Sequence, residues 1–97
     1  MWTFVKDLEN FYQKQTRRLW TNEGGDFVVT SFTLETDCGW KINETMAFLC
    51  DSEGNSLSHR DLAYIPGSED HGGCVNEIEG RILKEVKEKV ACKLSFL

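Results

Sequence analysis

The feature of this sequence that most constrains its fold is a change in the spacing of its apolar residues. Near both ends of the chain they recur at roughly the 3.6-residue helical period, whereas in residues 26–50 they tend to alternate with polar residues. This order predicts a two-layer α+β domain with an N-terminal helix, a three- to four-stranded antiparallel sheet and a C-terminal helix. The chain of 97 residues can build one core but not two, so residues 1–97 are expected to form a single domain.

The first predicted helix covers residues 3–20. Its stripe consists of Phe4, Leu8, Phe11, Tyr12, Gln15 and Leu19. Arg17 and Arg18 would suit the negative end of the helix dipole, and Gly24-Gly25 would stop the helix.

The second predicted helix covers residues 76–92. Asn76 can cap its first turn, and Glu79 completes a capping-box pattern. Its apolar stripe consists of Ile78, Ile82, Leu83, Val86, Val90 and Ala91. Ile82 and Val86 lie in the middle of that stripe, so both are expected in the core.

Three strands are predicted between the helices, at residues 26–35, 40–50 and within 56–65. Glu44 interrupts the alternation of the second strand and indicates a bulge or an edge position. One face of the sheet is expected to be open to solvent. That face would carry Ser31, Thr33, Glu35, Lys41, Asn43 and Thr45.

Residues 51–55 have the composition of a hairpin turn in which Gly54 or Asn55 adopts a positive φ. Their alternating oxygen ligands also suggest a calcium loop. However, an EF-hand needs glycine at its sixth position and glutamate at its twelfth, and here the twelfth residue is Leu62. The turn is the better interpretation.

The net charge of −5 is concentrated in the middle of the chain. Residues 21–73 contain ten acids and only two bases, Lys41 and Arg60, which gives this segment a charge of −8. An acidic surface repels nucleic acid and anionic lipid and attracts basic protein surfaces. The expected binding residues are acids beside turns together with one aromatic residue: Glu35, Asp37, Asp51, Glu53, Tyr64, Glu69 and Asp70. Trp40 is the alternative aromatic anchor.

The four cysteines are expected to be reduced, because the N-terminus lacks a secretory signal and no Cys-x-x-Cys occurs. Cytoplasmic localisation follows as an expectation, and no apolar run approaches the length of a membrane helix. His71 and Cys74 lie three residues apart, and Cys74 precedes the second predicted helix, where the helix dipole favours a thiolate. They leave open a small thiol- or zinc-dependent enzyme.

The sequence therefore predicts a non-enzymatic protein-binding or inhibitor domain, with the thiol or zinc enzyme as the alternative. Small acidic proteins of this kind include virus-encoded inhibitors of host or defence complexes. The expected partner is a basic surface of another protein, without direct contact to nucleic acid or membrane. No catalytic residue, cofactor or metal is predicted for the binding domain, and the sequence leaves the oligomeric state open.

Overall fold

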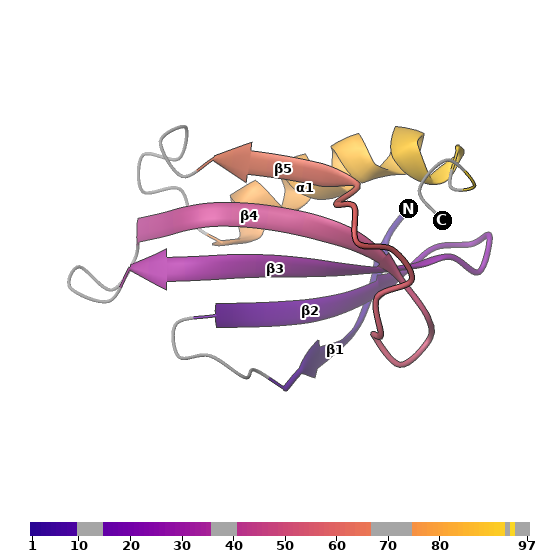
Figure 1. Cartoon of the computed structure of the whole chain (residues 1–97), viewed down its shortest axis with the longest axis horizontal. Coiled ribbons are helices and arrows are strands. Elements are labelled where there is room, and N and C mark those ends of the chain that lie inside the picture. The colour runs from indigo at the N-terminus through magenta and orange to yellow at the C-terminus, as the bar shows by residue number, and fades with distance from the viewer. Residues whose placement is uncertain (10–14, 36–40, 67–74, 93, 95–97) are drawn as a thin grey trace.

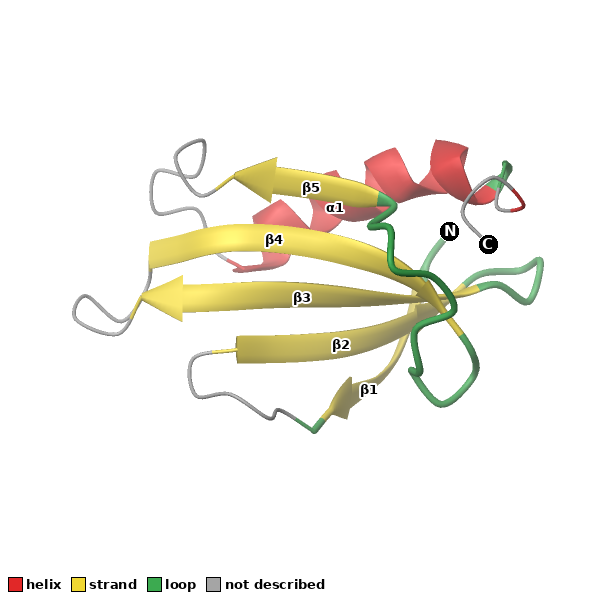
Figure 2. Cartoon of the chain, in the orientation of Figure 1, coloured by secondary structure: helices red, strands yellow, loops and turns green. Residues whose placement is uncertain are grey.

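The computed structural model of the chain describes residues 1–9, 15–35, 41–66, 75–92 and 94, with the backbone alone for residues 34–35, 41–43 and 75–77. Its elements are β1 (Thr3–Leu8), β2 (Gln15–Thr21), β3 (Phe27–Glu35), β4 (Lys41–Cys50), β5 (Ala63–Pro66) and α1 (Val75–Val90). The strands form one antiparallel sheet in which spatial order follows chain order, β1-β2-β3-β4-β5 (Figure 1). Helix α1 lies on one face of this sheet (Figure 2). The described chain therefore has one antiparallel sheet and one C-terminal helix, and the predicted two-helix layout is wrong.

The predicted N-terminal helix is wrong: residues 3–8 and 15–21 form β1 and β2 instead. Strand β2 pairs with β3 over its whole length, from Gln15 opposite Thr33 to Thr21 opposite Phe27. The segment also contains strand-favouring residues such as Phe4 and Trp20, which face each other across β1 and β2. Long-range pairing therefore overrides the helical spacing, and the sheet has five strands rather than three or four.

The predictions for β3 and β4 are confirmed to within one residue at each end. The bulge expected near Glu44 is present, because Thr33 pairs with Glu44 whereas Leu34 pairs with Ile42, which leaves Asn43 as the extra residue. The third predicted strand is shorter than expected. Only residues 63–66 form β5, although Cys50 and Ser56 make an isolated bridge earlier in the segment.

The C-terminal helix is confirmed at residues 75–90, and its apolar stripe forms the main core with the sheet. Ile82 and Val86 are fully buried, as predicted. The cluster of buried residues consists of Val28, Phe32, Ala47, Leu49, Leu62, Ala63, Ile65, Ile78, Ile82, Leu83, Val86 and Val90. We call the sheet face that packs on α1 the helix face and the opposite one the open face.

The predicted solvent face is wrong at Thr45 and Ser31. Thr45 is paired with Phe32 and Ile65 on the helix face and is 1% exposed, while Ser31 lies on the open face but is 5% exposed. The reason is that both faces carry apolar side chains. On the open face, Leu19, Val29 and Cys50 form a second buried cluster against Leu8 and Phe27. Alternation alone could not decide which side of β4 faces the helix.

Replacing Thr45 by valine is expected to raise the free energy of unfolding by about 1 kcal/mol. The buried Thr45 Oγ1 has no hydrogen-bond partner among the described residues, and burying an unpaired hydroxyl is costly. Thr30→Val is the matched control, because Thr30 Oγ1 accepts from Trp20 Nε1 at 3.0 Å and donates to Glu79 Oε2 at 3.0 Å. In urea titrations, the free energy of unfolding should rise for Thr45→Val and fall for Thr30→Val. Equal destabilisation would mean that Thr45 has a partner.

Candidate binding surface

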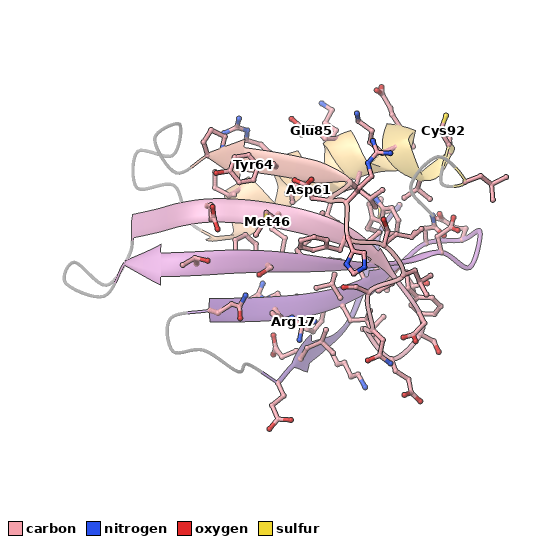
Figure 3. All side chains as sticks on the ribbon, viewed as in Figure 1. Arg17, Met46, Asp61, Tyr64, Glu85 and Cys92 are labelled. Carbon is pink, nitrogen blue, oxygen red and sulfur yellow. The ribbon has the colours of Figure 1, made fainter. Side chains whose placement is uncertain are left out.

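The open face of the sheet presents side chains of β2 to β5 away from α1. Register places Arg17, Ser31, Met46 and Tyr64 in one row across these strands. Figure 3 shows Arg17, Met46 and Tyr64 on the side turned to the viewer, with α1 behind the sheet. Gln15, two residues before Arg17 on β2, donates from Nε2 to Ser31 Oγ at 3.1 Å. The row therefore mixes one apolar, one aromatic and several polar groups on rigid strands.

Tyr64 is the predicted anchor that the structure places on this surface. It is 47% exposed, and its hydroxyl donates to Glu44 Oε2 at 3.2 Å. Partial loss of hydration raises the pKa of Tyr64, and the hydrogen bond to Glu44 and the charges of Glu44 and Asp61 raise it further. The phenol therefore stays protonated at neutral pH and keeps donating to Glu44.

Asp51 and Glu53 follow the end of β4, five and seven residues beyond Met46. Asp51 Oδ1 accepts hydrogen bonds from the backbone N–H groups of Glu53 and Asn55, both at 2.9 Å, and Oδ2 accepts from Asn55 Nδ2 at 3.2 Å. Asp51 thus holds the turn together, whereas the side chain of Glu53 is exposed. The turn prediction is confirmed, with Gly54 at φ 93°.

Gly54 also brings this turn against the first strand. A Cβ at Gly54 would lie 2.7 Å from Leu8 Cδ1, closer than nonbonded carbons approach. Leu8, Glu9 and Arg17 line a groove of about 370 Å³ together with residues 53–56. The 51–56 turn therefore lies against Leu8, which packs on the cluster of Leu19, Val29 and Cys50.

The stability contributed by Asp51 is expected to depend on pH. Its pKa is lowered chiefly by the backbone hydrogen bond from Asn55, so its contribution is present above the unfolded pKa of about 3.9 and is lost as the pH falls through the folded value. Asp51→Ala should lower the melting temperature at pH 7, and its difference from wild type should shrink towards pH 3. Glu53→Gln is the control, with no such convergence. Parallel pH curves for wild type and Asp51→Ala would contradict this role.

The remaining predicted residues are only partly placed. Glu35 is the last residue of β3, and only its backbone is described. The other predicted residues lie outside the described part of the chain: Asp37, Trp40, Glu69, Asp70, His71 and Cys74. The backbone of Glu35 pairs with Lys41, and Pro66 pairs with Glu44. The last residues of β3 and β5 therefore lie at the end of the sheet opposite Asp51. Among the described residues, Glu35 therefore lies at the opposite end of the sheet from Asp51 and Glu53.

Sequence reasoning missed Glu44 and Asp61 as neighbours of Tyr64. Glu44 was noticed only as a break in the alternation of its strand. Its position opposite the end of β5 depends on a pairing that joins residues 20 positions apart, which no local pattern reveals. Asp61 lies in the β4–β5 connection, and Figure 3 labels it beside Tyr64.

Sequence reasoning also missed a polar cluster on the helix face. Arg18 Nη1 donates to Glu79 Oε1 at 2.9 Å, and Glu79 is 3% exposed. Arg18 Nε lies 3.5 Å from Asp7 Oδ1, an ion pair without hydrogen-bond geometry. Glu79, expected to cap its own helix, therefore ties α1 to β2 and to Thr30 of β3.

The described residues offer little for thiol or metal chemistry. Cys50 is buried, and desolvation together with the charge of Asp51 raises its pKa to about 12, so it carries no thiolate at neutral pH. Cys92 is exposed. No group of three or more His, Cys, Asp or Glu residues within the described ranges is arranged to hold a metal ion. That the cysteines are all reduced stays a prediction.

Comparison with known proteins found no matching family model, no similar curated sequence and no similar solved structure. In the parts of the chain that the structure describes, no helix has the length and apolar character needed to span a membrane.

Proposed function

We propose that this domain binds another protein through the open face of its sheet, along β4 and β5. The observation that carries the proposal is Tyr64, an aromatic side chain 47% exposed on a strand and oriented by its hydrogen bond to Glu44. Tyrosine is among the residues that dominate binding energy at protein interfaces. A side chain already held in one orientation loses little conformational entropy on binding.

The proposed partner carries a basic surface. Glu44 and Asp61 both act electrostatically on Tyr64, so two carboxylates surround the aromatic anchor. Met46 lies next to Tyr64 across β4 and β5 and extends the apolar contact. Carboxylates at the rim of an interface act mainly on the rate of association. Glu53, exposed at the far end of β4, would add to this long-range attraction.

The test begins with capture of partners by immobilised protein from a lysate of the native host, quantified by mass spectrometry. Wild type is compared with Tyr64→Ala and with Leu57→Ala, whose side chain is 51% exposed in the β4–β5 connection. A true partner should be lost with Tyr64→Ala and retained with Leu57→Ala. Thermal unfolding of both variants checks that the fold is kept.

The second step measures association of that partner at increasing salt. The wild-type rate should fall as salt rises, because screening limits the field to about 8 Å near physiological ionic strength. Glu44→Gln combined with Asp61→Asn should slow association and weaken this salt dependence. Capture that ignores Tyr64→Ala, or association that ignores both salt and these substitutions, would refute the proposed surface.

A further inference from the structure

Helix α1 covers only part of the sheet face on which it packs. It packs mainly against β4 and β5, with Val28 and Phe32 of β3 completing the core, and β1 and β2 lie beyond its flank (Figure 1). Neighbouring strands are about 4.8 Å apart and a helix is about 10 Å across, so a five-stranded sheet can hold two helices side by side. Trp2, just before β1, donates its indole N–H to Leu83 O at 3.1 Å and closes the flank of α1 there. Beyond Trp2, the width of the sheet leaves the helix face over β1 and β2 for a second helix.

A groove of about 340 Å³ lies at this place, lined by Trp20, Glu79, Gly80 and Leu83. Phe4 is 46% exposed and meets Trp20 edge to face, with ring centroids 5.5 Å apart, so it extends the apolar surface. The polar groups at the floor already have partners, because the Trp20 indole bonds to Thr30 and the Glu79 carboxylate to Arg18 and Thr30. An apolar ligand would leave none of them unpaired.

Gly80 supplies a second, independent observation. It lies inside α1 and is exposed, and a Cβ at this position would meet no atom within 4 Å. Glycine inside a helix is destabilising relative to alanine, and no neighbour in the described structure requires it here. The missing side chain would allow the backbone of a ligand to approach α1 closely, because interhelical distance depends on side-chain size.

The flank of α1 beside the groove is basic. Lys84 and Lys87 are exposed and follow Gly80 and Leu83 by four residues each, which places them on the same side of the helix. The pKa of Glu23 is lowered chiefly by its hydrogen bond to the N-terminal amine, and Lys87 adds a smaller electrostatic contribution. Lys87 is therefore within electrostatic range of Glu23 in the β2–β3 turn.

We propose that this groove binds an amphipathic α-helix of a partner protein. The apolar stripe of that helix would lie on Phe4, Trp20 and Leu83, its backbone would pass over Gly80, and its acidic flank would face Lys84 and Lys87. Helix α1 spans 16 residues, or about 24 Å, so a ligand helix of three to four turns would match the length of the helix beside which it lies. This site lies on the helix face, opposite the surface of Tyr64.

The test uses a fluorescein-labelled synthetic peptide of about 15 residues, with leucines on one helical face and glutamates on both flanks. Fluorescence anisotropy should show saturable binding to the wild-type chain. Gly80→Met should weaken binding tenfold or more without lowering the melting temperature, because methionine favours helix more than glycine does. Glu85→Met, which places the same side chain on the side of α1 turned away from Gly80, should bind at least as tightly as wild type. Bound peptide should also shift the NMR resonances of the Trp20 indole and the Gly80 amide.

Three results would overturn the proposal: no saturable binding, equal binding by wild type and Gly80→Met, or stronger binding of a peptide with lysine in place of glutamate. Light scattering after size-exclusion chromatography identifies a different occupant. A wild-type dimer that Gly80→Met converts to a monomer would mean that a second copy of this chain fills the groove instead.

Discussion

Phe32→Ala is expected to lower the free energy of unfolding by about 3–5 kcal/mol, the largest loss for any single side chain considered. Phe32 is fully buried at the centre of the helix face and is the largest of the fully buried side chains. Its truncation removes apolar contacts and leaves a cavity between β3 and α1 that the rigid sheet cannot close. Since a domain of this size has roughly 5–15 kcal/mol of stability, urea denaturation should show a much earlier midpoint.

Phe4→Ala is the matched control for this prediction, because it makes the same chemical change at a position 46% exposed. The expected loss is about 0.5–1.5 kcal/mol, the value of its edge-to-face contact with Trp20. If Phe32→Ala does not fold, Phe32→Leu provides a graded measurement with an expected loss of about 1 kcal/mol. Similar losses for Phe4→Ala and Phe32→Ala would mean that α1 does not pack on Phe32.

Glu79→Ala is expected to lower the free energy of unfolding by about 3 kcal/mol. The change leaves the Arg18 guanidinium and the Thr30 hydroxyl without the carboxylate that they share at 2.9 and 3.0 Å. Breaking a buried ion pair costs about 3–5 kcal/mol, and the lower value applies because the Arg18 side chain is 28% exposed and close to Asp7. Chemical denaturation at pH 7 measures the loss.

The double variant Arg18→Met, Glu79→Leu separates the cost of leaving one charge unpaired from the net contribution of the ion pair to the free energy of unfolding. Replacing both charges by apolar side chains removes the desolvation cost together with the attraction, so the double variant should be more stable than Glu79→Ala. A double variant as unstable as Glu79→Ala would indicate that the pair itself, and not the orphaned arginine, carries the stability.

The parts of the fold that were predictable from sequence are those with one apolar side. Helix α1 exposes charged residues along one side, so Ile82 and Val86 identify its buried stripe without ambiguity. Residues 3–21 lack such a signal. Leu19 faces one cluster and Trp20 the other, so both sides of β2 carry apolar residues and the spacing resembles a helix. The pairing with β3 decides that residues 15–21 form a strand and not a helix. Local periodicity contains no information on pairing between distant segments.

The candidate surface was predictable only where the interacting residues are close together in sequence. The hydrogen bonds of Asp51 stay within four residues, and the composition of residues 51–55 predicted the turn that they hold, although not the bonds themselves. Tyr64 was chosen as an anchor for its residue type, but its contact with Glu44 needs the register of β4 against β5. The ion pair of Arg18 and Glu79 joins residues 61 positions apart, and charges so far apart in sequence give no pairwise signal.

Because each strand of the sheet pairs with its neighbour in sequence, the whole meander can assemble by successive hairpins as the chain leaves the ribosome. Helix α1 comes last, and until it has emerged Val28, Phe32, Ala47 and Leu49 have no cover. A nascent chain that stalls before residue 75 would therefore display a preformed apolar sheet, which is a substrate for chaperones and a seed for aggregation. Docking of the sixteen-residue helix α1 is therefore the step that covers the apolar face of the sheet.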